Sequence, residues 1–307
     1  MTAIRKVSIV GAGAMGAAYA AMFTDAAGFS VSFVARGERY ERLKNKTLTV
    51  NARLYNVPVV HPDKVPEPAD LILVALKHHH LDAAVGDIAA LAGKDTAILS
   101  VMNGLESEAT IGAACGMDKL VCAIAVGIDA MHENDRFTYA NPGKIIFGPF
   151  KDDGKGSRLA RIGEALNRAG IPNEVPADMM RAMWWKFMIN VGINQASAVL
   201  RAPYGVFQSS PEARALIRSL MGEVVTLAKK AGIGLTEADI DEWDTIMNTL
   251  SPTGKTSMLQ DVEARRKTEV EIFAGTVVSL GKEYDMPTPV NATILRIIKV
   301  IESCRGG

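Results

Sequence analysis

The sequence predicts a two-domain α/β protein, with a sheet domain over residues 1–177 followed by an all-helical domain over residues 178–307. Three observations support this prediction. A strand, a glycine-rich turn, a helix and a second strand follow one another within the first 35 residues. Further strand signals alternate with helical ones as far as Val175, whereas only helical patterns follow Asp178. Between the two regions, the segment from Ile171 to Pro176 contains two prolines, which is typical of a domain boundary.

Composition indicates an ordinary globular protein. Of 307 residues, 48% are hydrophobic and 22% are charged, and the formal net charge is zero, which argues against nucleic acid or a membrane surface as a partner. The longest apolar segment, Ala182 to Leu200, is interrupted by Lys186 and by asparagines, so it does not read as a membrane span. Three scattered cysteines suit reduced thiols. We therefore expect a soluble, cytoplasmic protein.

The first strand, Lys6 to Val10, runs directly into a glycine-rich turn. A helix from Ala17 to Ala27 and a strand from Ser30 to Ala35 come next, which is the context of a Rossmann-type dinucleotide-binding domain. Its glycines have different roles: the first permits the tight turn, the second lets the backbone approach a pyrophosphate, and the third lets the helix sit close to the strand. The predicted phosphate-binding residues are Gly11, Ala12, Gly13, Ala14, Met15 and Gly16.

The end of the second strand indicates which dinucleotide is bound. An NAD site usually has an acidic residue there to hold the ribose 2′-hydroxyl. This chain has Arg36 instead, and a guanidinium can pair bidentately with a 2′-phosphate. The sequence therefore predicts NADPH/NADP in preference to NADH.

Two further polar positions follow later strands of the predicted sheet. Lys77 comes after the strand Leu71 to Ala75, and Asn103 comes after the strand Ala97 to Val101. Either could be an ordinary loop residue, but ligands bind at the carboxyl ends of strands in open α/β sheets. We expect a small hairpin between Leu48–Val50 and Val57–Val60.

The rest of the first domain is predicted to contain mostly antiparallel strands over residues 120–150, a helix near 157–169 and an edge strand at 173–175. The tract His78-His79-His80 resembles a metal-binding sequence. Consecutive side chains diverge on a regular backbone, however, so we predict no metal site.

The second domain is predicted to contain helices at about 178–200, 211–231, 237–250, 256–263, 266–284 and 289–303. In the first of these, Lys186, Asn190 and Asn194 are spaced four residues apart and share one face of an otherwise apolar helix. A buried ammonium needs a partner, so this column is either a satisfied structural network or a carbonyl-binding site.

Two other stretches of the second domain carry polar residues in apolar surroundings. Thr256 and Ser257 follow a flexible loop, and either could be a helix cap. Glu269 is predicted to lie in the first turn of a helix, where an acidic residue commonly complements the helix dipole. Neither position indicates a function by itself.

Taken together and in order, these motifs resemble the ketopantoate reductase family, the 2-dehydropantoate 2-reductases. The resemblance runs from end to end. It rests on the glycine-rich turn with Arg36, on Lys77, on Asn103-Gly104, on Trp185-Lys186 with the two asparagines, on Thr256 to Asp261, on Arg266 to Glu269, and on Pro287 to Asn291.

The resemblance implies NADPH-dependent reduction of 2-dehydropantoate to pantoate, a step of pantothenate and coenzyme A biosynthesis. It makes Lys186 the proton donor and Glu269 the second catalytic residue. It assigns substrate binding to Asn103, Asn190, Asn194 and Ser257, and it assigns cofactor contacts to the glycine-rich turn, Arg36, Lys77, Asn103 and Glu269. A small 2-keto acid would be the substrate, and the helical domain is compatible with a homodimer.

One departure from the family pattern bears on the substrate. Gly254 stands where many members have an asparagine that helps to hold the substrate. This departure bears on which 2-keto acid is the substrate. Two alternatives stay open. One is a D-2-hydroxyacid dehydrogenase acting on another branched or aromatic 2-keto acid, and the other is a non-catalytic NADP-sensing protein. The second predicts loss of Lys186 or Glu269, and both residues are present.

Overall fold

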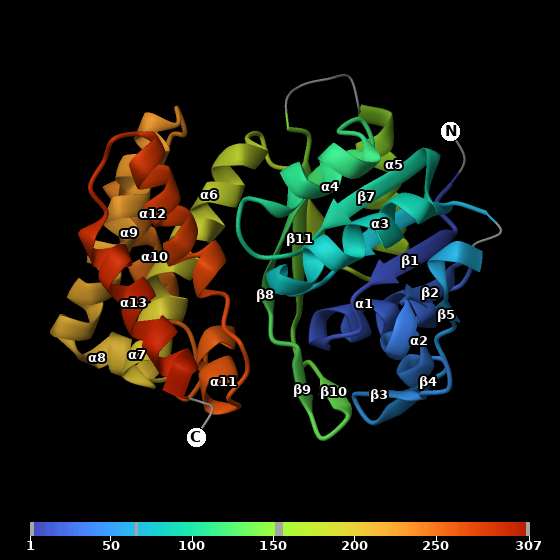
Figure 1. Cartoon of the computed structure of the whole chain (residues 1–307), viewed down its shortest axis with the longest axis horizontal. Helices are drawn as coiled ribbons and strands as arrows, with labels where there is room; N and C mark the ends of the chain where they lie inside the picture. The colour runs from blue at the N-terminus through green and yellow to red at the C-terminus, as the bar shows by residue number, and fades with distance from the viewer. Residues whose placement is uncertain (1–2, 65–66, 151–155, 305–307) are drawn as a thin grey trace. The chain divides into compact units, whose positions relative to one another are not determined.

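The computed structural model describes residues 3–64, 67–150 and 156–304. The chain divides into two compact units, Met1–Met179 and Met180–Gly307, which are described separately below. Figure 1 shows the sheet and its helices in the first unit and the helices of the second.

The first unit is built on an eight-stranded sheet with the order β12-β11-β8-β7-β6-β1-β2-β5. Neighbouring strands are parallel except for β8 and β11, which are antiparallel. The order runs outward in both directions from β1, as expected for a doubly wound fold. The strands are β1 (Lys6–Val10), β2 (Ser30–Val34), β5 (Val59–Val60), β6 (Ala69–Val74), β7 (Ala92–Ser100), β8 (Leu120–Ile128), β11 (Pro142–Gly148) and β12 (Asn173–Glu174).

Two hydrophobic clusters show that helices cover both faces of this sheet. One cluster joins α1 (Ala14–Asp25) and α5 (Gly156–Arg168) to strand residues such as Ile9 and Leu73. The other joins α3 (Leu81–Leu91) and α4 (Ser107–Cys115) to residues such as Ile72 and Ile98 (Figure 1). Because adjacent strand residues face opposite sides, strands buried on both faces are continuously apolar. A short helix, α2 (Gly37–Leu43), follows β2.

The predicted hairpin was wrong in its second strand. β3 (Leu48–Val50) pairs with β4 (Arg53–Tyr55), whereas Val59–Val60 is the edge strand β5, parallel to β2. The turn residues Asn51 and Ala52 have φ values of 47° and 62°, which allow the tight reversal of a two-residue hairpin. A second, four-stranded sheet is completed by β10 (Arg136–Thr138) and β9 (Met131–Glu133).

The described residues of the second unit form helices and no strands. The bounds are α6 (Met179–Ile189), the π-helical turn η3 (Asn190–Asn194), α7 (Gln195–Leu200), α8 (Tyr204–Ser209), α9 (Pro211–Lys230), α10 (Glu237–Met247), α11 (Ser257–Glu263), the 3₁₀ turn η4 (Val270–Ile272), α12 (Ala274–Glu283) and α13 (Pro289–Ser303). None of the described helices is long and apolar enough to cross a bilayer.

Two helix predictions in this unit need correction. The helix predicted over 178–200 contains a π-helical turn, and the helix predicted over 266–284 begins only at Ala274. Before Ala274, Phe273 has φ −106° and ψ −90°, outside the helical region, and the backbone makes the short turn η4 instead. The short helix α8 was not predicted from the sequence.

Candidate functional site

In the first unit, the predicted cofactor-binding residues follow four adjacent strand ends. Val34, Val10, Val74 and Ser100 are aligned across β2, β1, β6 and β7. All four strands are parallel, so their carboxyl ends share one edge of the sheet, and chain order reverses at β1. The residues that follow these ends include the glycine-rich turn, Arg36, Lys77 and Asn103. The sheet thus brings to one edge positions that are up to 92 residues apart in sequence (103 − 11).

The glycine-rich turn connects β1 to α1, and its three glycines differ in the space that a side chain would have. Gly11 has φ +118°, and a Cβ atom there would lie 2.4 Å from the Ala75 carbonyl oxygen. A Cβ atom on Gly16 would lie 1.8 Å from the Gly11 carbonyl oxygen. A Cβ atom on Gly13, which is exposed at the N-cap of α1, would meet nothing within 4 Å. Gly13 therefore leaves free space beside the N-terminus of a helix, where backbone N–H groups favour anions.

Lys77 and Asn103 are both half-buried in loops after their strands. Lys77 precedes the 3₁₀ turn η2 (His78–His80), and Asn103 precedes Gly104, which has φ +92°. Among the described residues, no group of three or more His, Cys, Asp or Glu side chains is placed to hold a metal ion.

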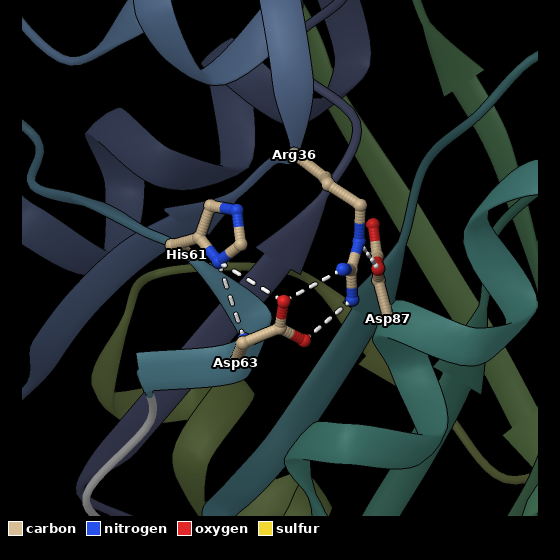
Figure 2. Close-up of polar contacts among 4 residues, drawn as sticks. All are labelled: Arg36, His61, Asp63 and Asp87. Atoms are coloured by element: carbon tan, nitrogen blue, oxygen red, sulfur yellow. Dashed lines mark hydrogen bonds and ion pairs between the residues drawn. The ribbon is translucent and has the colours of Figure 1, made fainter.

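Arg36 is the N-cap residue of α2, and two acidic side chains bind its guanidinium (Figure 2). Nη1 and Nη2 donate to the two carboxylate oxygens of Asp63 at 2.7 and 2.8 Å, and Nε donates to Asp87 at 2.9 Å. Neither acidic residue was singled out in the sequence, because they lie 27 and 51 positions beyond Arg36. Asp63 lies in the 3₁₀ turn η1 (Pro62–Lys64), and Asp87 lies on α3.

In the second unit, Lys186 lies half-buried on α6, one helical turn before Asn190. The π-helical turn that follows contains Asn194, which is 7% exposed. Gly192, at the centre of the turn, is packed so closely that a Cβ atom would lie 2.5 Å from the side chain of Met221 on α9. π-Helical turns inside α-helices are frequent at functional sites.

A directed chain of hydrogen bonds orients both asparagines. The backbone N–H of Met258 can only donate, and it donates to Asn194 Oδ1 at 3.4 Å, as does Ser257 Oγ at 3.2 Å. Asn194 Nδ2 consequently donates to Asn190 Oδ1, at 2.9 Å. Asn190 is left with a buried Nδ2 that has no hydrogen-bond partner among the described residues. The chain of amides therefore ends in an unused donor.

The helix-cap interpretation of Thr256 and Ser257 holds for the first of them. Thr256 Oγ1 accepts a hydrogen bond from the Leu259 backbone N–H at 3.1 Å, which caps α11. Ser197 Oγ on α7 lies 2.5 Å from the same Thr256 hydroxyl. Because Thr256 serves as the cap, the Ser257 hydroxyl is left to contact Asn194.

Gln195 is a structural residue of this site that the sequence did not reveal. It is fully buried, and its Nε2 donates to the Val191 carbonyl at 2.7 Å and to Asn291 Oδ1 at 3.1 Å. Its Oε1 accepts from the Ala274 backbone N–H at 2.9 Å. A single side chain thus satisfies a carbonyl within the π-helical turn and an N–H at the start of α12. It thereby ties the π-helical turn to the start of α12 and to Asn291 on α13.

Replacing Gln195 by leucine is expected to lower the free energy of unfolding by about 3 kcal/mol, because buried backbone groups lose their partners. For a unit of this size the melting temperature would fall by roughly 6–12 °C, which calorimetry would measure. The control is Gln260→Leu, which removes one 3.4 Å bond to the Lys255 carbonyl in an exposed setting. Equal melting temperatures for the two variants would contradict this role of Gln195.

Glu269 is only 6% exposed and directly precedes η4. It does not lie in the first turn of α12, so the interpretation as a simple partner of that helix dipole was wrong. Its neighbour Thr268 is held by Glu302 of α13, which accepts from the Thr268 backbone N–H at 2.7 Å and from its hydroxyl at 2.6 Å. The buried Glu269 carboxyl thus lies on a backbone that a second helix fixes in place.

The first unit is a doubly wound sheet with a glycine-rich turn at the point where chain order reverses. The helical unit that follows carries a lysine and buried amides. This combination is typical of the class of dinucleotide-dependent oxidoreductases. Two family models match the chain. "Ketopantoate reductase PanE/ApbA" matches residues 7–152, and "Ketopantoate reductase PanE/ApbA C terminal" matches residues 178–302. The chain belongs to the ketopantoate reductase family. It is an oxidoreductase that acts on a CH–OH group and uses a nicotinamide dinucleotide.

Individual relatives can be aligned with nearly the whole of this chain. A 2-dehydropantoate 2-reductase of Archaeoglobus fulgidus is 28% identical over 302 residues, which cover 98% of this chain and 99% of that protein. A D-mandelate dehydrogenase solved with NADH and anilino(oxo)acetate has a TM-score of 0.88 at 20% identity, covering 98% of this chain and 100% of the other. A dimeric ketopantoate reductase from Staphylococcus aureus has a TM-score of 0.83 at 24% identity, with the same coverage. The two structural likenesses show the fold.

Proposed function

We propose that this protein reduces 2-dehydropantoate to pantoate with NADPH, a step of pantothenate and coenzyme A biosynthesis, and that it does so in the cytoplasm. The observation that carries this proposal is the unused Nδ2 donor of Asn190 at the end of the chain of amides. A buried donor without a partner costs about 1–3 kcal/mol. A substrate carboxylate, hydroxyl or carbonyl oxygen would supply the missing acceptor.

We assign substrate binding to Asn190, Asn194 and Ser257 of the second unit. Asn194 and Ser257 hold Asn190 in one orientation, so the donor needs no rearrangement when the substrate arrives. In the first unit, Asn103 stands at the strand edge with the cofactor-binding residues, so we assign it to both substrate and cofactor. Glu269, buried and fixed beside Thr268, is assigned a second catalytic role that also contacts the cofactor.

We propose that Lys186 protonates the reduced carbonyl oxygen. The bound dinucleotide supplies a hydride, so negative charge develops on the substrate oxygen. An ammonium group stabilises that charge and donates the proton from Nζ. Met183 and Phe187, which lie near Lys186 in the sequence of α6, are buried, and Lys186 itself is half-buried.

We propose that the phosphates of the cofactor bind the turn from Gly11 to Gly16, beside the exposed Gly13 at the N-terminus of α1. Lys77 and Arg36 lie at the same edge of the sheet, and Arg36 would meet the 2′-phosphate of NADPH. We also propose that the protein is a homodimer, as the Staphylococcus aureus relative is described to be. Light scattering of the purified protein tests the oligomeric state.

One observation supports another 2-keto acid as an alternative substrate. A Cβ atom on Gly254 would lie 3.0 Å from both the Tyr204 ring and the Ser251 carbonyl, so this backbone leaves little room for a larger residue. Because residue 254 is glycine, it offers no side-chain amide to a substrate. The fold is also shared with a mandelate dehydrogenase, for which an aromatic 2-keto acid is the corresponding oxidised compound.

A substrate panel separates these possibilities. Loss of NADPH absorbance would be followed with 2-dehydropantoate, an unbranched aliphatic 2-keto acid and phenylglyoxylate. We expect kcat/KM for 2-dehydropantoate to exceed both others by at least about tenfold, which corresponds to one well-formed polar contact. A higher kcat/KM for phenylglyoxylate would contradict the proposed substrate while leaving the reaction type in place.

A further inference from the structure

Arg36, proposed above as the contact for the 2′-phosphate, is already paired with two carboxylates. Figure 2 shows Asp63 on the end of its guanidinium and Asp87 beside it. Of the five N–H bonds of an arginine, three are used in this way, including one from each terminal nitrogen. The end-on fork that would suit a phosphate is therefore occupied by Asp63.

The charges around Arg36 do not favour a second anion. One guanidinium and two carboxylates give a local formal charge of −1 (+1 − 2). Hydrogen bonds from Arg36 hold the pKa of Asp63 below its usual range, so this carboxyl stays ionised at neutral pH. His61 borders the same carboxylate, since its Nδ1 accepts the Asp63 backbone N–H at 3.3 Å and lies 3.7 Å from Asp63 Oδ2.

The two acidic residues differ in their freedom to move. The Asp87 side chain is 14% exposed and belongs to α3, so it holds Nε in a fixed position. The Asp63 side chain is 58% exposed and lies in a three-residue turn. Asp63 is therefore the group that a ligand anion can displace, whereas Asp87 keeps the guanidinium in place.

We propose that Asp63 is a specificity-determining residue, which competes with the cofactor 2′-phosphate for Arg36 and limits the preference for NADPH over NADH. The inference rests on the proposed dinucleotide site. A 2′-phosphate carries a charge of about −1.5 to −2. To pair bidentately with Arg36, it must displace Asp63 and remain close to both carboxylates. The uncharged ribose 2′-hydroxyl of NADH displaces nothing, and it can donate a hydrogen bond to a carboxylate oxygen.

The test measures dinucleotide affinity directly, without a keto acid, by calorimetric titration of the full-length protein and of Asp63→Asn. Asparagine keeps the size of the side chain and removes its charge. We expect Asp63→Asn to bind NADPH and 2′,5′-ADP on the order of five- to tenfold more tightly, with less than a twofold change for NADH and AMP. Asp63→Ser, which shortens the side chain and removes its charge, is expected to shift the ratio of NADPH to NADH affinity in the same direction.

The matched control is Asp25→Asn. Asp25 forms the same type of bidentate pair with Arg53, at 2.8 and 3.0 Å, near the end of α1. This control is expected to leave the ratio of NADPH to NADH affinity unchanged.

Three results would overturn the inference, and they have different meanings. Weaker NADPH binding by Asp63→Asn would show that Asp63 positions Arg36 for the phosphate. An unchanged ratio of NADPH to NADH affinity would show that Asp63 has no part in the choice between the two dinucleotides. If the unaltered protein bound neither dinucleotide, the proposed cofactor site would fail together with the inference. If the ratio shifts as expected but no 2-keto acid is reduced, the inference stands and the proposed reaction fails.

Discussion

The variant Lys186→Ala is expected to lower kcat by about 10²–10⁴-fold, the usual contribution of a positioned proton donor. NADPH affinity should change by less than about twofold, because the cofactor-binding residues that we propose lie mainly in the first unit. Stopped-flow measurement of NADPH oxidation with 2-dehydropantoate would give kcat, and titration of NADPH fluorescence would give the affinity. Turnover comparable to that of the unaltered protein would refute the role of Lys186.

Two further variants sharpen this test. Lys186→Arg keeps a positive charge but cannot release a proton near neutral pH, so it should remain well below the unaltered enzyme in kcat. If charge alone were needed, Lys186→Arg would instead recover most of the activity. Lys230→Ala, which removes an exposed lysine at the end of α9, serves as the control and should leave kcat unchanged.

The second large effect is expected in the glycine-rich turn, where two alanine substitutions should give opposite patterns. In Gly13→Ala, the new methyl group meets no protein atom within 4 Å, and the backbone φ of −84° suits alanine. We expect the melting temperature to be preserved within a few degrees. Dinucleotide affinity should fall by at least about tenfold, because the methyl group would stand where the pyrophosphate approaches the backbone.

Gly16→Ala should instead destabilise the first unit. Its Cβ atom would lie 1.8 Å from the Gly11 carbonyl oxygen, so the turn and α1 must move apart. We expect the free energy of unfolding to fall by the few kcal/mol typical of overpacking, which gives a clearly lower melting temperature. Dinucleotide binding should be lost as well. Calorimetry and dinucleotide titration on the two variants check both patterns. If Gly13→Ala bound NADPH as tightly as the unaltered protein, the proposed position of the phosphates would be wrong.

Most of the sheet could be predicted because its strands are apolar throughout and are bounded by glycine or polar residues. The strand Lys6–Val10 is found at the predicted residues, and the later strands β6 and β7 overlap the predicted ones. The hairpin was harder, because Val57 to Val60 looks as strand-like as Arg53 to Tyr55. Sequence pattern identifies a strand, but pairing depends on which neighbour the chain reaches.

In the second unit, helical periodicity predicted the long helices but not their irregularities. The π-helical turn at Asn190–Asn194 depends on a close contact between Gly192 and Met221, and on Gln195 bonding the Val191 carbonyl. The late start of α12 depends on the same Gln195, which accepts from the Ala274 N–H. The Gly192–Met221 and Gln195–Ala274 contacts join residues that are 29 and 79 positions apart (221 − 192 and 274 − 195), which local propensity does not report.

The sequence by itself determined the family, the α/β fold with its helical second part, and the set of residues that we propose for the reaction. These follow from local patterns, because apolar periodicity, glycine positions and motif order are all written along the chain. Only the tertiary structure decided that Asn190 ends the chain of amides with an unused donor, and that Arg36 is paired with Asp63 and Asp87. Hydrogen bonds and ion pairs form between side chains that meet only after folding. Their partners therefore cannot be read from the order of residues.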